Sequence, residues 1–212
     1  MPVNNIPPKK AVIIDDHPLA IVAIRSLLEA NNISVIAEEE DGRMGLKSII
    51  NLKPDIAIID LDLPIYSGIE IIESLRKKNS TCIVIIVSAK SDYFYGRRCA
   101  EAGANAFISK KKGLNDIINA IDATCNGYSY FPFSNNKFID TPSSEVMKLD
   151  SLSMQEVKVM RYLLKGMDIS LISTQMKISS KTVSTYKSRL MDKLGCTTLI
   201  ELYDLAHRNK LG

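Results

Sequence analysis

The stretch Pro54-Asp55-Ile56-Ala57-Ile58-Ile59-Asp60-Leu61-Asp62 sets a short apolar run directly before two carboxylates. The run Ile56–Ile59 is too short for a helix, and its isoleucines are typical of a strand buried on both faces. Runs of the same kind, rich in Ile and Val, recur at Ala11–Ile14, Val35–Ala37, Ile83–Val87 and Ala106–Ile108. We therefore expect five short buried strands in the first part of the chain.

Amphipathic stretches fill the gaps between these runs. They have the apolar spacing of helices and cover Leu19–Asn31, Gly42–Leu52, Gly68–Lys78, Asp92–Ala102 and Leu114–Asn126. Strands that alternate with helices predict an α/β fold, here a doubly wound five-stranded parallel sheet. Such sheets bind ligands just beyond the carboxyl ends of their strands, so the residues that follow each strand are the first candidates for a site.

The pattern changes after residue 128. Residues 129–150 are rich in Ser, Asn and Pro and lack periodicity, which predicts a linker, although the aromatic stretch Tyr128–Phe133 is expected to pack back on the first domain. Helices are then expected over 153–165, 169–176, 180–194 and 198–208, and the turn Lys177–Ser180 joins two of them as a helix-turn-helix. The expected organisation is an N-terminal extension (1–9), an α/β domain (10–128), a linker (129–150) and a smaller all-α domain (151–212).

Composition and charge narrow the function classes. Of the 212 residues, 46% are hydrophobic and 24% are charged, as in ordinary globular proteins. No apolar run approaches the roughly 20 residues of a membrane span, and the amino end lacks an apolar signal core, so we expect a cytoplasmic protein. Residues 151–212 contain 10 Lys and Arg against 5 Asp and Glu, whereas residues 1–128 contain 15 against 16. A small basic domain behind a neutral one indicates a polyanionic partner, although it is also compatible with a solvated surface.

Polar residues follow four of the expected strands. Asp15 and Asp16 follow the first, Asp60 and Asp62 the third, Ser88 the fourth and Lys110 the fifth. In a parallel sheet these groups meet at one edge. Clustered carboxylates are unfavourable without a cation, and their oxygens suit Mg²⁺, while an amine and a hydroxyl suit phosphoryl oxygens. These residues together predict a phosphoryl site in which Asp60 can form an aspartyl-phosphate. Taken singly, an Asp here is usually a helix cap, Ser88 is most often a turn residue and Lys110 is most often a solvated surface residue.

The basic domain contains one helix with two distinct faces. In Ser180–Leu194, Val183, Leu190 and Leu194 recur at the spacing of a buried face. Small hydroxyl residues and cations occupy the rest of the surface, which suits a DNA major groove, although an ordinary amphipathic surface helix has the same pattern. The candidate DNA-contacting residues are Lys181, Thr182, Ser184, Thr185, Lys187, Ser188 and Arg189.

Longer strings point to a known family. The first domain carries Ile13-Ile14-Asp15-Asp16-His17-Pro18, Pro54–Pro64 with Gly68, Ser88-Ala89 and Phe107-Ile108-Ser109-Lys110. With these strings it resembles the flavodoxin-like receiver domain of two-component response regulators. The second domain carries Leu152-Ser153, Glu156, Gly166, Ile178-Ser179, Lys181-Thr182-Val183 and Lys193-Leu194. It is similar to the LuxR/NarL/FixJ-type DNA-binding domain, although Tyr186 stands where that family usually has His, so base preference is not carried over.

The resemblance implies a role for each matching residue. Asp60 is the implied phosphoacceptor, and Mg²⁺ is implied on Asp15, Asp16, Asp60 and the backbone carbonyl of Asp62. Ser88 and Lys110 are implied to contact the phosphoryl oxygens, and Phe107 to change position with Ser88. The implied partners are a sensor histidine kinase or its phosphotransfer domain, double-stranded promoter DNA and a second copy of the chain, with RNA polymerase as a further candidate and no membrane.

The expected function is therefore a response regulator that controls transcription as a dimer, and not an enzyme beyond its own phosphoryl acceptance. Two alternatives remain open. One is a DNA-binding regulator that does not depend on phosphorylation. The other is a haloacid-dehalogenase-type phosphatase, because Asp60-Leu61-Asp62 has the letters of its Asp-x-Asp motif, although that motif belongs on a first strand. The leucines Leu199, Leu202 and Leu205 form a stripe that is a candidate dimer contact or simply closes the small core.

Overall fold

The chain forms two compact units, Met1–Pro132 and Phe133–Gly212. The structure, a computed structural model, describes residues 9–90, 92–111, 113, 115–131, 144–209 and 211. Each unit has its own apolar core, so each is considered by itself. The first unit is α/β and the second is all-α, as the sequence predicts.

The first unit is built on a five-stranded parallel sheet in the order β2-β1-β3-β4-β5. All five expected strands are confirmed, each extended by one or more residues. Their bounds are β1 Lys9–Ile14, β2 Ile33–Glu39, β3 Ile56–Asp60, β4 Ile83–Ser88 and β5 Ala106–Ser109. β3 and β5 are buried along their whole length, which explains their unbroken apolar sequences, whereas β2 at the edge is only half-buried.

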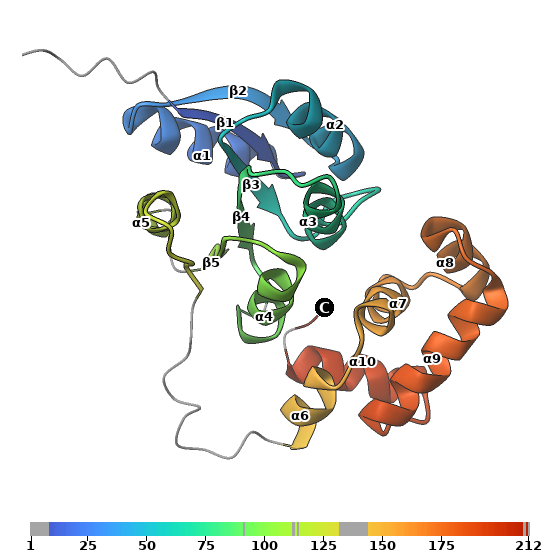
Figure 1. Cartoon of the computed structure of the whole chain (residues 1–212). Helices are drawn as coiled ribbons and strands as arrows, with labels where there is room; N and C mark the ends of the chain where they lie inside the picture. The colour runs from blue at the N-terminus through green and yellow to red at the C-terminus, as the bar shows by residue number, and fades with distance from the viewer. Residues whose placement is uncertain are drawn as a thin grey trace, which may run out of the picture. The chain divides into compact units, whose positions relative to one another are not determined.

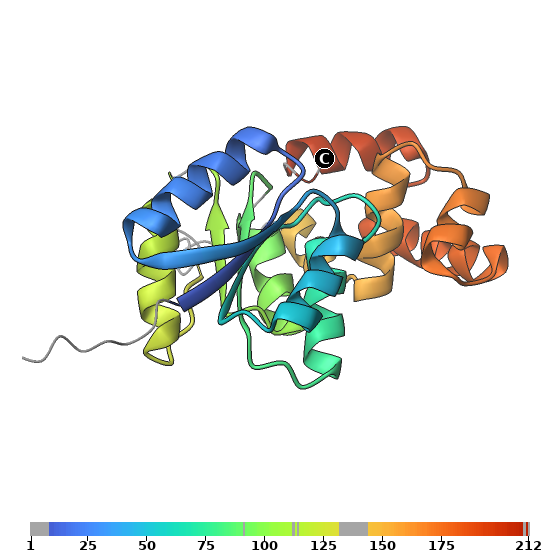
Figure 2. The ribbon, with the colours of Figure 1, turned by 90° about the horizontal axis from the view of Figure 1, so that it is seen from above.

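Helices cover both faces of this sheet (Figures 1 and 2). α1 (Pro18–Ala30) and α5 (Asn115–Cys125) pack on one face, where residues such as Ile24 and Ile117 join a core with Ile13 and Ile58. The helices α2 (Gly42–Leu52), α3 (Gly68–Lys77) and α4 (Asp92–Ala102) lie on the other face. This is the doubly wound arrangement expected from the alternating pattern.

Strand register decides which residues leave the sheet together. Ile14 lies opposite Ile59, so Asp15 and Asp60 follow at neighbouring positions of the carboxyl edge. The position of Gly68 fixes the start of α3 against the end of β3, since a Cβ there would lie 2.7 Å from the carbonyl oxygen of Asp60. Ser67 caps α3 in a capping box with Glu70. The loop between β3 and α3 is therefore held at both ends, next to the predicted phosphoryl site.

The second unit contains five helices within the described residues. They are α6 Ser144–Asp150, α7 Met154–Leu164, α8 Ile169–Met176, α9 Ser180–Leu194 and α10 Leu199–Arg208. The capping box of Ser153 and Glu156 opens α7, and the bounds of α8 and α9 agree with the sequence prediction. The turn between α8 and α9 places Lys177 at a positive φ of 54°, as a helix-turn-helix connection needs a tight reversal.

Two boundaries differ from the sequence prediction. Lys9 belongs to β1 and not to an N-terminal extension, whose residues 1–8 lie outside the described part of the chain. Residues 144–150 form α6 and not linker. Its stability comes from tertiary contacts, which a seven-residue sequence does not reveal: Leu149 is buried, and Glu145 binds the side chains of Arg208 and Asn209. Residues 132–143 of the expected linker are outside the described ranges.

Two smaller expectations are resolved by packing. Tyr130 does pack back on the first unit, since its backbone pairs with Asn105 and Phe107 at the edge of β5. The leucine stripe of α10 mainly closes the core, because Leu202 and Leu205 are buried and, of the three leucines, only Leu199 is exposed.

Among the described residues, the helices are all too short or too polar to cross a membrane.

Candidate functional site

The carboxyl edge of the sheet brings two acidic side chains onto one lysine. Asp15, which follows β1, and Asp60, which ends β3, are both almost fully buried. The Nζ atom of Lys110, which follows β5, lies 2.7 Å from Oδ2 of Asp15 and 2.9 Å from Oδ1 of Asp60. The backbone NH of Lys110 donates to the carbonyl of Ser88, so the ends of β4 and β5 are joined at the same place. The predicted convergence of these residues is confirmed.

Burial and charge act against each other in this group. Burial raises the pKa of Asp60 above its ordinary value, and the charge and hydrogen bond of Lys110 offset only part of that effect. Burial lowers the pKa of Lys110, but the hydrogen bond to Asp15 and the charge of Asp60 outweigh it, so the lysine pKa is raised. Two buried carboxylates thus share one ammonium, and an additional cation at this edge is electrostatically favoured.

A second layer of contacts holds Asp60 and Ser88. The backbone NH of Asp62 donates to Oδ2 of Asp60 at 2.7 Å, while the carboxylate of Asp62 faces Lys90 at 3.2 Å. The backbone NH of Lys90 donates to the buried Oγ of Ser88, whose hydroxyl hydrogen can still be donated to an incoming oxygen. Phe107 is fully buried in β5 and lies under Gly96 of α4. Asp60, Asp62 and Ser88 therefore lie together at the carboxyl edge of the sheet, and Phe107 lies within β5, two residues before its end.

His17 is a member of this site that the sequence analysis did not single out. Its Nδ1 atom lies 2.8 Å from Oδ1 of Asp16 and 3.2 Å from Oδ1 of Asp15. Within the described residues, Asp15, Asp16 and His17 form a group whose ligand atoms all lie within 4.8 Å of one another, and Asp60 is not part of that group. The chemistry of these donors fits a divalent cation, since carboxylate oxygens are the ligands that Mg²⁺ prefers. The position of His17 directly after Asp15 and Asp16 in the sequence was the signal that could have placed it at the site.

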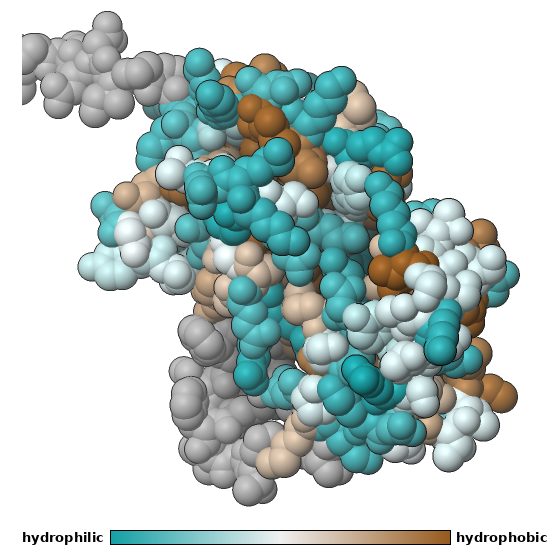
Figure 3. Space-filling model, turned by 45° about the vertical axis from the view of Figure 1, so that its right-hand side comes forward, coloured by the Kyte–Doolittle hydropathy of each residue, from teal (hydrophilic) through white to brown (hydrophobic). Residues whose placement is uncertain are grey.

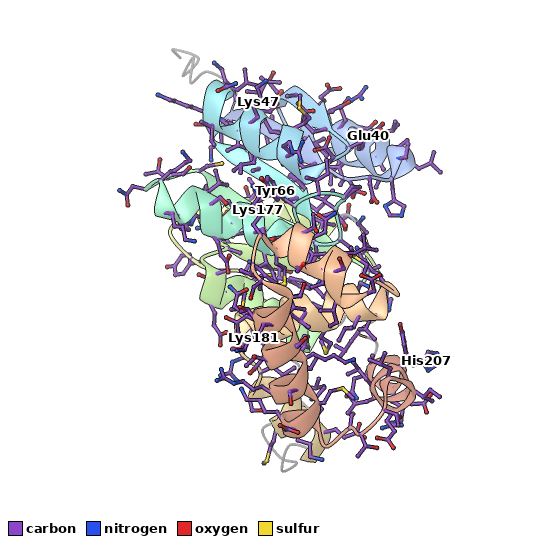
Figure 4. The ribbon with its side chains drawn as sticks, turned by 90° about the vertical axis from the view of Figure 1, so that its right-hand side faces the viewer. Glu40, Lys47, Tyr66, Lys177, Lys181 and His207 are labelled. Atoms are coloured by element: carbon purple, nitrogen blue, oxygen red, sulfur yellow. The ribbon has the colours of Figure 1, made fainter. Side chains whose placement is uncertain are left out.

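The second unit presents α9 as the sequence predicts. Val183, Leu190 and Leu194 are buried, which confirms the apolar face. Of the candidate DNA-contacting residues, Thr182 and Lys187 are half-buried, while the exposed ones are Lys181, Ser184, Thr185, Ser188 and Arg189. Figure 3 shows mostly pale and hydrophilic side chains over the C-terminal helices, with small apolar areas. Figure 4 labels Lys177 in the turn before α9 and Lys181 in its first turn.

Local hydrogen bonds define how α9 presents its hydroxyl groups. Ser179 caps the helix: its Oγ accepts from the NH of Thr182 and also lies 2.8 Å from the hydroxyl of Thr182. The hydroxyl of Thr185 donates to the carbonyl of Lys181 at 3.0 Å. Because that bond uses the hydroxyl hydrogen, Thr185 presents lone pairs to the solvent and can accept a hydrogen bond from a DNA base.

The far end of α9 is held by an ion pair between a partly exposed lysine and a buried glutamate. Nζ of Lys193 lies 2.7 Å from Oε2 of Glu156, which is 3% exposed, and it also donates to the carbonyl of Ser151. Burial raises the pKa of Glu156, but the bonds from Lys193 and from the NH of Ser153 outweigh it, so its pKa is lowered. The pair ties α9 to the start of α7.

We expect Lys193→Met to destabilise the second unit by about 2 kcal/mol, less than for a fully buried pair because Lys193 is partly exposed. Hydrogen exchange of the α7 and α9 amides in the full chain measures this loss. A lowered carboxyl pKa stabilises the fold above the ordinary Glu value and loses that effect as the pH falls through the lowered value. The wild type should therefore lose more stability than the variant on acidification. Lys181→Met, on the exposed face, is the matched control and should change neither quantity.

Comparison with known proteins agrees with this arrangement. Residues 11–122 match the family described as the response regulator receiver domain, and residues 150–206 match the bacterial regulatory proteins of the luxR family. The chain is 57% identical over 202 residues to the DNA-binding transcriptional activator EvgA of Escherichia coli K12, covering 95% of this chain and 99% of EvgA.

This chain is a LuxR-family response regulator. It is also 38% identical over 205 residues to the putative positive transcription regulator BvgA of Bordetella pertussis, covering 95% of this chain and 98% of BvgA. A structure of RcsB from Salmonella enterica serovar Typhimurium, bound to promoter rprA with the phosphomimetic BeF3−, has a TM-score of 0.74 at 21% identity and covers 95% of this chain and 99% of that one. That similarity supports the fold of the response regulator. Both of these relatives are named as transcription regulators.

Proposed function

We propose that this response regulator is phosphorylated on Asp60 by a sensor histidine kinase or its phosphotransfer domain, and that phosphorylation controls its binding to promoter DNA as a homodimer. The observation that carries this proposal is the buried Asp60 carboxylate, held by Lys110 at 2.9 Å beside a second buried carboxylate. With chromosomal DNA as its ligand, we place the protein in the cytoplasm. The name of the Escherichia coli relative favours activation of transcription.

The proposed reaction is a single displacement at phosphorus. An oxygen of Asp60 forms a bond to the phosphorus while the bond between phosphorus and the donor imidazole nitrogen breaks, and that electron pair remains on the imidazole. Lys110 moves its ammonium onto a phosphoryl oxygen and keeps its bond to Asp15. Ser88 donates its hydroxyl hydrogen to another phosphoryl oxygen. Buried Phe107 lies opposite Ile86 in the ladder of β4 and β5, two residues before the partner of Ser88, and its ring would follow that shift.

Asp15 and Asp16, with Asp60 and the backbone carbonyl of Asp62, would hold Mg²⁺. When bound, this cation neutralises the negative charge that gathers on the phosphoryl oxygens during transfer. The protein's own part is to hold the acceptor carboxylate still, through the NH of Asp62, and to keep the site dry, since Asp15, Asp60 and Ser88 are all nearly inaccessible to water. An enclosed site of this kind strengthens each electrostatic contact with the transferred group.

A labelling experiment tests the proposal. The protein is incubated with phosphoramidate and Mg²⁺, and its mass is expected to rise by one phosphoryl group on the peptide that contains Asp60. Selection of bound DNA from a random pool, with and without phosphoramidate, then shows whether the modification alters binding. Identical DNA binding in both states would favour a phosphorylation-independent regulator, and repeated turnover of a phosphate ester would favour a phosphatase.

The variant Lys110→Met tests whether phosphorylation of Asp60 can persist while the resulting change in DNA affinity is lost. Without the ammonium, a phosphoryl oxygen loses its charged partner, so we expect labelling of Asp60 to persist at a reduced rate while the phosphorylation-dependent gain in DNA affinity falls at least tenfold. The comparison is made by measuring DNA affinity at equal, mass-verified levels of phosphorylation. Lys111→Met, at the neighbouring exposed position, serves as control and should behave like the wild type. A full DNA response in the Lys110 variant would remove Lys110 from the proposed mechanism.

A further inference from the structure

A cavity of about 620 Å³ opens at the amino edge of the sheet, opposite the edge that carries Asp60. It is lined by the start of β1, by the residues just before β3 and β4, and by the last turns of α2, α3 and α5. Nζ of Lys9 in β1 contacts Sγ of Cys125 at the end of α5, so these two elements meet at the cavity. Its volume lies within the roughly 300–1,000 Å³ of sites that bind small organic ligands.

The floor of this cavity is apolar. Ile49 of α2 and Leu75 of α3 line it, and both belong to the buried core. Burial raises the pKa of the Cys82 thiol, which also lines the cavity, to about 12, so this thiol stays neutral. Ile50, which is 37% exposed, extends the apolar lining toward the solvent. An apolar group placed here would release water from these surfaces, which favours binding.

The charged side chains around this floor are mostly cations. Lys9, Lys53 and Lys78 line the cavity, and all three are exposed. Among the described lining residues, Asp55 is the only acidic one, and its carboxylate accepts a hydrogen bond from the NH of Lys10 at 2.8 Å. Three ammonium groups against one carboxylate leave the cavity with an excess of positive charge, which favours an anionic ligand.

The ends of the helices do not account for all of these lysines. Lys53 follows α2 and Lys78 follows α3, where a cation offsets the negative end of the helix dipole. The segment between α3 and β4 already has another cation, because the half-buried guanidinium of Arg76 donates to the carbonyls of Ser80 and Cys82 at 2.9 and 3.1 Å. Within the described part of the chain, the ammonium groups of Lys53 and Lys78 make no ion pair, so both are available to a ligand.

We propose that this cavity binds a small organic acid, whose apolar body covers the floor while its carboxylate lies among the lysines. Inorganic phosphate would leave the apolar floor uncovered, and a neutral apolar molecule would leave the lysines without a partner. The site is separate from the proposed phosphorylation of Asp60 and does not depend on it, because it lies at the other edge of the sheet.

Octanoate is the probe for this site, and octanol, which has the same chain without the charge, is its comparison. Titration of the full chain, followed by ¹H–¹⁵N NMR, should show that octanoate shifts the amides of lining residues such as Lys78 and Ile83. Octanol should bind about tenfold more weakly, because it makes no charged contact. Octanoate binding should weaken at high salt, and saturating octanoate should raise the midpoint of thermal unfolding.

Two pairs of variants separate the charge from the apolar floor. Lys78→Met keeps the aliphatic stem and should weaken octanoate binding about threefold without changing octanol binding, while Lys77→Met, at an exposed lysine outside the lining, should change neither. Ile50→Asn should weaken the binding of both molecules. Leu52→Asn, at an apolar residue of similar exposure outside the lining, is its control and should bind both as the wild type does.

The result that would overturn the proposal is equal binding of octanoate and octanol, or equal losses in a variant and its control, since either would mean nonspecific binding to the surface. Asp60→Asn should bind octanoate as the wild type does. Amide shifts centred on Asp15 and Lys110, together with loss of binding in Asp60→Asn, would place the carboxylate at the carboxyl edge of the sheet and would also overturn the proposal.

Discussion

Asp60→Asn abolishes phosphorylation, both from phosphoramidate and from a protein donor, because the amide cannot attack phosphorus as the carboxylate does. The expected mass increase is zero under conditions in which the wild type takes up one phosphoryl group. Asp62→Asn is the matched control. Its carboxylate faces Lys90, and its backbone NH, which the substitution keeps, donates to Asp60, so this variant should still be labelled. Labelling of the folded Asp60 variant would show that another side chain is the acceptor.

The same substitution has a second expected effect, on stability. Burial raises the pKa of Asp60 despite Lys110, so this carboxyl stabilises the fold when protonated and loses that effect as the pH rises through the raised value. At neutral pH the charged carboxylate therefore lowers the stability of the fold, and Asn removes that charge. In a metal-free buffer at pH 7 we expect the unfolding midpoint of Asp60→Asn to equal or exceed that of the wild type. A marked decrease would mean that the contact with Lys110 outweighs the burial of Asp60.

The sheet and most of the site followed from sequence because one physical constraint governs both. Strands buried on both faces need unbroken Ile and Val runs, and the residue after such a run must leave the sheet at its carboxyl edge. Asp15, Asp60, Ser88 and Lys110 could thus be placed together before any geometry was known. Their proximity could be predicted from the strand order and the parallel direction of the strands alone.

The features that sequence did not reveal depend on contacts between distant segments. α6 is stabilised by Glu145 binding Arg208 and by burial of Leu149, and a seven-residue helix has too few positions to show a period. His17 is placed beside the site by the turn that starts α1, where its backbone NH donates to the carboxylate of Asp15. Ile65, in the loop between β3 and α3, has a φ of 69°, which β-branched residues disfavour. The local sequence therefore predicts a different backbone conformation at this position. In each case tertiary structure overrides a local signal.

On the DNA-binding helix, loss of Thr185 and loss of Lys187 should affect binding in different ways. Thr185 is exposed in the middle of the expected contact face, and its hydroxyl hydrogen is already bonded to the carbonyl of Lys181. It can therefore accept a bond from an amino group of adenine or cytosine. We expect Thr185→Ala to weaken binding to the specific site by about 1–3 kcal/mol and to a random duplex far less. Thr185→Ser keeps the hydroxyl and should retain most of the discrimination.

Lys187 is half-buried. A lysine in this position can bury its aliphatic stem and still extend its ammonium to a DNA phosphate. Lys187→Ala should weaken binding to specific and random duplexes alike and lower the dependence of log K on log salt by about one unit, as should Arg189→Ala. Lys165→Ala, an exposed lysine at the end of α7, is the control and should leave the salt dependence unchanged. The measurement is a salt series on both duplexes for each variant. If Lys187→Ala altered only base preference while Thr185→Ala weakened both duplexes equally, the two residues would have to exchange roles, with the lysine reading a guanine edge and the threonine contacting the backbone.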